Sequence, residues 1–202
     1  MKMWKTGLLL LLVMMIGALV YGIRVIRRGF STREAPSALE TYVARTIRDL
    51  SIPRDAKQEE NPWIGSATPA VMADARAHWA DHCATCHAND GSGNTEMGDG
   101  LYPKPPDMRL PATQNLTDGE LYYIIRNGVR LTGMPAWGDP HLDQDDESWQ
   151  LVLFIRHLPK MTAEEAKEME KLNPKSQMDD LEIETSGEIK STGQKPENHQ
   201  HQ

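Results

Sequence analysis

The chain has 202 residues, of which 39% are hydrophobic and 25% are charged, a composition that allows one globular domain with attached segments. Its formal net charge of −7 argues against nucleic-acid binding, because phosphate backbones attract basic proteins. The charge is uneven: residues 24–57 hold eight Lys or Arg and four Asp or Glu, whereas residues 63–160 hold seven and thirteen. A basic arm (24–57) therefore leads to an acidic head (63–160).

The N-terminal segment, residues 1–28, is typical of a membrane anchor. Its charge-free stretch from Thr6 to Ile23 has eighteen residues, which as a helix at about 1.5 Å per residue spans a bilayer core. Trp4 and Tyr21 lie near its ends, where interfacial aromatic side chains are common. A cleaved secretory signal is the alternative, but no small-residue cleavage site follows the apolar stretch. We expect residues 6–23 to contact membrane lipid.

Residues 29–62 are expected to form an amphipathic helix and a linker. Ser37 and Glu40 fit an S-x-x-E capping box that begins a helix ending near Leu50. Its apolar positions fall on one stripe at helical spacing: Leu39, Tyr42, Val43, Thr46, Ile47 and Leu50. The stripe has two interpretations, a docking face for a partner or the membrane surface, or a spacer that packs on the head. The second is favoured, because apolar stripes usually face a core.

The next helix begins at Thr68 and Pro69, an N-cap followed by proline, and carries the most informative motif of the chain. Residues 83–87 spell C-x-x-C-H, the signature of covalent c-type haem attachment. Two thiols one helical turn apart can form thioethers with the two vinyl groups of one haem. The following residue, His87, then supplies the proximal iron ligand.

Other uses of the two thiols are a zinc site, a redox dithiol and a disulfide. A zinc ribbon needs four ligands, and the chain has only two cysteines, Cys83 and Cys86. No βαβ pattern of the kind that accompanies thioredoxin-type dithiols precedes Cys83. Haem attachment is therefore the favoured interpretation.

A sixth iron ligand is predicted from a loop at residues 132–138, T-G-M-P-A-W-G. Its two glycines and its proline disfavour a helix, so Met134 is presented from a loop as one soft sulfur ligand. His141 follows the same loop and is the alternative ligand. His78, His82 and His157 are weaker alternatives.

Residues 63–160 resemble a class I c-type cytochrome, related to the haem-subunit domain of cbb3-type oxidases. The resemblance rests on C-A-T-C-H and on T-G-M-P-A-W-G, whose Met134 lies 47 residues after His87, and it covers about half of the chain. It implies an all-α class I cytochrome c fold around one covalent haem c. Cys83 and Cys86 are then the haem attachment points, and His87 and Met134 are the axial ligands.

The resemblance also implies a function. We expect a membrane-anchored mono-haem electron carrier with no catalytic residues, whose partners are membrane or periplasmic redox proteins. The alternatives are a haem subunit of a larger oxidoreductase and a peroxidase-like haem enzyme with a labile sixth ligand. The basic residues after the span would keep the head in the cytoplasm by the positive-inside rule. Because c-type haem is attached outside the bacterial cytoplasmic (inner) membrane, we expect the head to face the periplasm.

Further residues take roles by the same resemblance. Ala75 and Trp79 match positions that cross the final helix, and a proline carbonyl is expected to accept a hydrogen bond from His87 Nδ1. The candidates for that carbonyl are Pro103, Pro105 and Pro106, and those for bonds to the haem propionates are Tyr102, Arg109 and Trp137. Residues 97–112 are rich in glycine and proline and predict an irregular loop.

Two helices are expected to complete the head. Thr117 and Glu120 form a second capping box, and the helix that they begin ends at Gly128. The final helix ends at Pro159. Residues 161–202 predict a charged helix to about Leu172 and then a disordered polar tail, whose terminal His199 and His201 would bind a metal only weakly.

Overall fold

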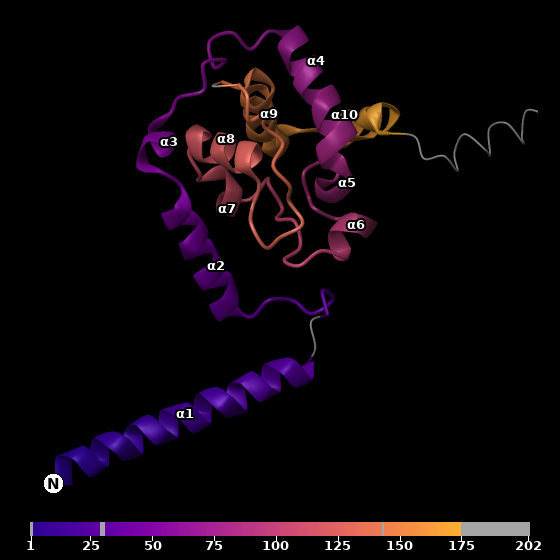
Figure 1. The fold of residues 1–202 in the computed structure, drawn as a ribbon. Helices are drawn as coiled ribbons and strands as arrows, with labels where there is room; N and C mark the ends of the chain where they lie inside the picture. Colours follow the sequence, from indigo (N-terminus) through magenta and orange to yellow (C-terminus); the bar gives the residue numbers. More distant parts are fainter. Residues whose placement is uncertain (1, 29–30, 143, 175–202) are drawn as a thin grey trace, which may run out of the picture.

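The computed structural model describes residues 2–28, 31–142 and 144–174, and these ranges contain helices and loops without a strand (Figure 1). The all-α class expected from the sequence is confirmed. The acidic head of the sequence (63–160) is a bundle of short helices, and segments on both sides of it pack against this bundle. The expected tail from residue 175 onward, with His199 and His201, lies outside the described residues.

The first helix, α1 (Lys2–Arg28), stands apart from the head (Figure 1). The most apolar eighteen-residue stretch within Trp4–Arg27 has a mean hydropathy of 2.5, and none of it is buried inside the structure. A helix of 24 residues rises about 36 Å, enough for the bilayer core. By length and composition α1 is therefore an N-terminal transmembrane helix.

The predicted amphipathic helix is α2 (Ala38–Ser51), and its capping box is confirmed. The Ser37 side chain accepts from the backbone N–H of Glu40 at 3.2 Å, and the Glu40 carboxylate accepts from the backbone N–H of Ser37 at 2.7 Å. The expectation that the apolar stripe packs on the head is wrong. No residue of α2 is buried, and the large apolar side chains of the stripe face away from the head.

The chain joins the head through α3 (Arg54–Gln58), which packs against α8 (Asp118–Asn127). Ile52 and Ala56 are buried there, and the hydroxyl of Thr117 donates to the carbonyl oxygen of Lys57 at 2.9 Å. The approach is close enough to require glycine: a Cβ on Gly119 would lie 1.9 Å from the Ala56 carbonyl oxygen. The end of the basic arm is thus fixed to the head.

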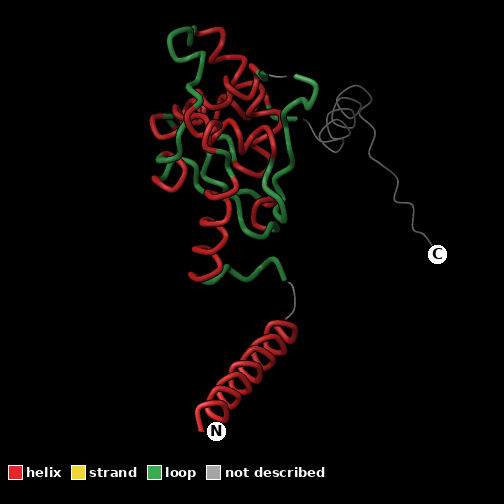
Figure 2. Tube along the Cα trace, turned by 60° about the vertical axis from the view of Figure 1, so that its left-hand side comes forward, coloured by secondary structure: helices red, strands yellow, loops and turns green. Residues whose placement is uncertain are grey.

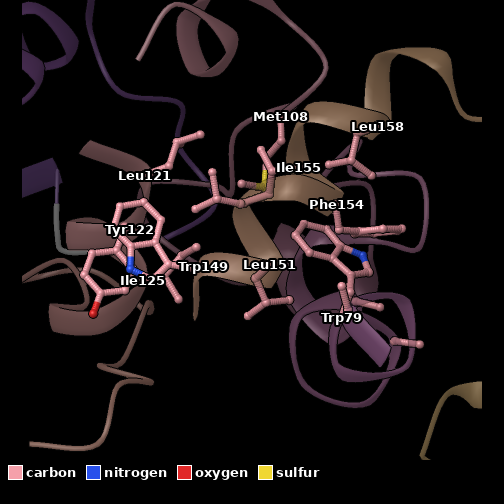
Figure 3. Close-up of a cluster of buried hydrophobic side chains, with 14 of the residues drawn as sticks. Trp79, Met108, Leu121, Tyr122, Ile125, Trp149, Leu151, Phe154, Ile155 and Leu158 are labelled. Carbon is pink, nitrogen blue, oxygen red and sulfur yellow. The ribbon is translucent and has the colours of Figure 1, made fainter. Parts of the chain in front are cut away.

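The core of the head lies where α4 (Pro69–His78), α8 and α9 (Asp146–His157) pack together (Figure 3). The ring of Trp79 lies 5.4 Å from that of Phe154, centroid to centroid, and the rings of Tyr122 and Trp149 stack at 3.9 Å. Ala75 and Trp79 are both buried and face α9, as expected. The buried apolar residues at the centre of this cluster are Trp79, Leu121, Tyr122, Ile125, Trp149, Leu151, Val152, Phe154, Ile155 and Leu158.

The residues before each of these helices explain where they begin. Thr68, Thr117 and Asp145 are the N-caps of α4, α8 and α9, and each side chain accepts a hydrogen bond from the backbone N–H three residues later. The expectation of an irregular stretch over residues 97–112 needs a small correction. The single-turn helices α6 (Glu96–Asp99) and α7 (Pro111–Gln114) overlap its two ends, beginning after Thr95 and at Pro111.

The charged helix after the head is α10 (Ala163–Met169), which follows the turn η2 (Leu158–Lys160) and continues into the turn η3 (Glu170–Leu172). It packs on the head. The Glu165 carboxylate lies 2.9 Å from His157 Nε2 and pairs with Arg76 of α4, and Met169 is fully buried in the main core cluster. Residues on both sides of 63–160 therefore contribute to the packing of the head.

Candidate functional site

The C-x-x-C-H motif lies at the end of a helical run from Pro69 to His87 that is not regular throughout. α4 is followed by a π-helical turn, η1 (Trp79–Cys83), in which the Ala84 N–H bonds to the Trp79 carbonyl, and then by α5 (Ala84–His87). A π turn adds one residue to a helical turn, and such turns are frequent at functional sites. This turn has no signature in the sequence and was not expected.

The two cysteines, Cys83 and Cys86, are free thiols and are half-buried. Burial and, to a lesser extent, the neighbouring Cys86 raise the pKa of the Cys83 thiol to about 12. A redox or nucleophilic cysteine requires a lowered pKa, because the thiolate is the reactive form. The environment of Cys83 therefore argues against the dithiol interpretation.

The His87 ring is held in an apolar environment. Its centroid lies 5.9 Å from that of Trp79, and its Nδ1 is buried without a hydrogen-bond partner among the described residues. Burial lowers the pKa of His87 to about 4, so the imidazole is neutral at physiological pH. A neutral imidazole is the form that binds iron.

A buried polar atom without a partner requires an explanation, and the site fits a haem. The imidazole of His87 follows two free thiols on one helical turn, as the covalent attachment of a haem requires. Within the described residues there is no group of three or more His, Cys, Asp or Glu side chains that could hold a metal ion directly. The donor set therefore fits an iron carried by a cofactor better than an ion held by side chains.

The backbone after the motif is fixed by hydrogen bonds to its carbonyl oxygens. Trp79 Nε1 donates to Ala88 at 3.1 Å, the Gly93 N–H donates to His87 at 2.9 Å, and Thr95 Oγ1 donates to Cys86 at 3.3 Å. Ala88 ends the helix with a φ of 62°. These bonds hold the direction in which His87 leaves the helix, and the Trp79 bond was not predicted from the sequence.

The Met134 loop folds back on the end of α8. Val129 N–H donates to the Met134 carbonyl at 3.1 Å, and the Met134 N–H donates to Thr132 Oγ1 at 3.1 Å. Gly128 has a φ of 66°, and a Cβ there would lie 2.6 Å from the carbonyl carbon of Pro135. These bonds and contacts hold the loop against the end of α8, and it is not helical, as its glycine and proline content predicted.

The structure brings the two halves of the predicted site to one core. Cys83 and Met134 are both partly buried and pack against the cluster that contains Trp79 and Phe154. A second contact joins the same segments, because the rings of His82 and Trp137 stack at 5.2 Å with an angle of 10°. The helical run and the Met134 loop thus lie next to each other, although 47 residues separate His87 from Met134.

Other residues singled out from the sequence make contacts of their own. Arg109 binds the carboxylates of Asp107 and Asp90 at 2.7 and 2.8 Å, and the Tyr102 hydroxyl donates to Glu40 at 3.3 Å. Trp137 stacks on His82. Among the described residues no proline carbonyl accepts from His87 Nδ1, so the expectation for Pro103, Pro105 and Pro106 is wrong for this structure.

The alternative histidine ligands differ in their surroundings. His157 binds the Glu165 carboxylate, and His78 faces Glu147 at 3.4 Å. His141 is exposed, and its backbone N–H donates to Asp139. Met134 is partly buried and packs against the core cluster, as Cys83 does.

Comparison with known proteins also points to a c-type cytochrome for the helical core. Residues 70–155 match the model of the family described as cytochrome c oxidase, cbb3-type, subunit III. The chain carries a cbb3-type cytochrome c haem domain. The matched residues begin in the first turn of α4 and end in α9, so this cytochrome c domain contains the C-x-x-C-H motif and the Met134 loop.

A curated relative of the chain is the cbb3-type cytochrome c oxidase subunit FixP of Rhizobium meliloti (strain 1021). The two are 31% identical over 138 residues, which cover 62% of this chain and 43% of the relative. The chain therefore spans less than half the length of FixP. The match supports a haem electron-transfer role for residues 70–155, and α1 has the length and composition of a membrane anchor.

Proposed function

We propose that the cytochrome c domain binds one haem c covalently, through thioethers from Cys83 and Cys86, with His87 and Met134 as the axial iron ligands. The observation that supports this most directly is the buried, neutral and unpartnered imidazole of His87 immediately after the two thiols. Haem bound there supplies one-electron chemistry, because its iron changes oxidation state by one electron.

The protein's own residues then have three tasks. His87 stays neutral and keeps its direction through the bonds to its carbonyl and to that of Ala88. The loop of Met134 is held by Gly128 and Thr132. The apolar cluster around Trp79 and Phe154 keeps water from the ligands. None of these tasks moves a proton, which suits an electron carrier rather than a haem enzyme.

We propose further that residues 63–160, the predicted haem domain, face the periplasm, with α1 in the bacterial cytoplasmic membrane. A tether raises the effective concentration of the carrier near membrane oxidoreductases. Its donors and acceptors are then membrane or periplasmic redox proteins. Alkaline phosphatase is active only outside the cytoplasm, so a fusion of it after residue 174 should be active in cells. A fusion protein that is made but inactive would contradict this orientation.

The test of the haem assignment is the full chain expressed in membranes and examined by haem staining after denaturation and by optical spectroscopy. We expect haem to remain attached to the denatured protein and to be lost from the Cys83→Ala/Cys86→Ala double variant. Met134→Ala should abolish the weak long-wavelength band of sulfur-to-iron ligation and should open the reduced iron to carbon monoxide. Met97→Ala, at an exposed methionine, is the control and should change neither.

A different result would reassign the site. If the band persists in Met134→Ala, methionine is not the ligand, and His141→Ala becomes the next variant. If the wild-type protein binds carbon monoxide when reduced, its sixth position is open, and the peroxidase-like alternative is favoured over the carrier.

A second proposal is that the protein is a subunit of a larger oxidoreductase, supported by its similarity to an oxidase subunit. Mild solubilisation and native electrophoresis with haem staining distinguish the two. Haem that migrates with a complex of several other chains indicates a subunit, and haem that migrates at the size of this chain alone indicates a free carrier.

A further inference from the structure

Helix α2 has an apolar face that the head does not cover. Four of its large side chains are more than half exposed: Leu39 at 68%, Tyr42 at 69%, Ile47 at 62% and Leu50 at 80%. Val43 lies between them and is 43% exposed. These positions recur at three, four and eight residues from Leu39, so they share one face of the helix. Such a concentration of exposed apolar side chains marks an interaction surface.

The rest of α2 is fixed to the head, which sets the direction of this face. Glu40 accepts a hydrogen bond from Tyr102, and Lys57 Nζ donates to the carbonyl of Asp49 at 2.6 Å. Ile52, directly after the helix, is 3% exposed. Both views place α2 at the edge of the head, where the chain leads to α1 (Figures 1 and 2). Whatever binds the apolar face therefore also orients the head.

The position of α2 along the chain points to the membrane surface. Nine residues, 29–37, separate the end of α1 from the start of α2. A fully extended segment of this length reaches at most about 30 Å. A transmembrane α1 thus keeps the start of α2 within that distance of the lipid headgroups.

Charge favours an anionic lipid surface over another protein of the same charge as the head. The basic arm, residues 24–57, has eight basic and four acidic residues, and three of the basic residues end α1. α2 itself holds two arginines and two acidic residues, and exposed Arg33, Arg45 and Arg54 lie before, within and after it. An apolar face flanked by arginine is the composition of helices that lie in the membrane interface. The acidic head (63–160) would be repelled by anionic lipid, so contact would be limited to the basic arm.

We propose that α2 lies in the interface of an anionic membrane with its apolar face among the lipids, and that it thereby holds the head in one orientation. The inference rests on α1 as a membrane anchor and does not depend on how the haem is ligated. It adds a second membrane contact, and that contact gives the haem domain a defined side facing the bilayer.

The experiment is photo-crosslinking of the full chain in nanodiscs that contain phosphatidylglycerol and phosphatidylcholine. A benzophenone amino acid replaces Ile47 on the apolar face or, as the matched control, Ala38, which is exposed and lies nine residues before Ile47, on the opposite side of α2. A third variant places the same group at Leu11 of α1 and reports on the anchor itself. Lipid adducts are identified by mass spectrometry of the intact protein.

We expect adducts with lipid at positions 11 and 47 and several-fold fewer at position 38. Replacing phosphatidylglycerol by phosphatidylcholine should reduce adducts at 47 and leave those at 11 unchanged. Adducts at 11 with no more at 47 than at 38 would overturn the inference and leave the anchor intact. Protein–protein adducts at 47 would also overturn it, because they assign the face to a second copy. The absence of adducts at 11 would instead reject the anchor and the inference together.

Discussion

The indole Nε1 of Trp79 donates a hydrogen bond of 3.1 Å to the carbonyl oxygen of Ala88, the residue after His87. Trp79 is 2% exposed and also packs beside the His87 ring and Phe154. One side chain therefore joins the core of the head to the residue proposed as the proximal ligand.

The first prediction concerns this bond. Trp79→Phe should lower the free energy of unfolding of the full chain by about 1–3 kcal/mol, because it leaves the Ala88 carbonyl without its hydrogen-bond donor. Urea titration in detergent measures the change. Trp63→Phe is the matched control, since Trp63 Nε1 bonds to Asp146 at an exposed position, and it should cost less. Equal losses in the two variants would contradict the role of the Trp79 bond.

The second prediction concerns the Met134 loop. Gly128 has a φ of 66° and a ψ of −171°, a conformation that costs residues with a side chain about 1–3 kcal/mol. Gly128→Ala would also bring a Cβ against Pro135. We expect reduced stability together with a weakened sulfur-to-iron band in the optical spectrum.

Gly65→Ala is the control for that variant, because no atom lies within 4 Å of its Cβ position. It should change stability by less than about 0.5 kcal/mol. An unchanged spectrum in Gly128→Ala would show that the loop does not depend on this glycine.

The third prediction is a pH dependence. The side-chain hydrogen bond from Arg109 holds the pKa of Asp107 below its ordinary value of 3.8. A carboxyl with a lowered folded-state pKa contributes stability above its unfolded pKa and loses it as the pH falls through the folded pKa. Wild type should therefore lose stability below about pH 4 more steeply than Asp107→Asn does.

Thermal unfolding at a series of pH values between 2 and 7 measures that difference. Asp99→Asn is the control, because its partner Lys104 is an exposed side chain. Parallel pH profiles for wild type and Asp107→Asn would rule out the contribution of this pair.

The fourth prediction follows from the charge of the head, which contains thirteen acidic and seven basic residues. Reduction of the haem by a small cationic complex should slow as salt is added, and reduction by an anionic complex should accelerate, because salt screens attraction and repulsion alike. Stopped-flow spectroscopy at several ionic strengths measures both. Rates that do not respond to salt with either reagent would show that the acidic residues lie away from the site of electron entry.

The fifth prediction concerns α10. Met169 is completely buried, so Met169→Ala should lower the free energy of unfolding by about 2–5 kcal/mol. Leu172→Ala, at a residue that is 44% exposed, should cost much less. If both variants are neutral in urea titration, the helix after residue 160 is dispensable for the head.

The sequence predicted the helices of the head well because their starts are local. Ser37, Thr68 and Thr117 cap helices through bonds to residues three positions away, and such pairs are visible in the chain. The packing of α10 was not predicted. Its one deeply buried side chain, Met169, lies in a highly charged segment. Its Glu165 pairs with His157 and with Arg76, which lies in a helix far away in the sequence, and no local pattern reveals such a pair.

The apolar stripe of α2 shows a different limit. Helical periodicity predicts that Leu39, Ile47 and Leu50 share a face, and it does not say what covers that face. Likewise the motifs around His87 and Met134 suggested which residues form the site, whereas the partners of Arg109 and Tyr102 depend on the paths of loops that the sequence does not specify.

The π turn at Trp79–Cys83 makes the number of residues before the haem motif as important as their identity. A π turn takes one residue more than an α-helical turn, so the same residues in an unbroken α-helix would wind further round its axis. The cysteines would then emerge about 100° further round the helix axis, and His87 would point elsewhere. The π turn therefore decides on which side of the helix axis the C-x-x-C-H motif emerges.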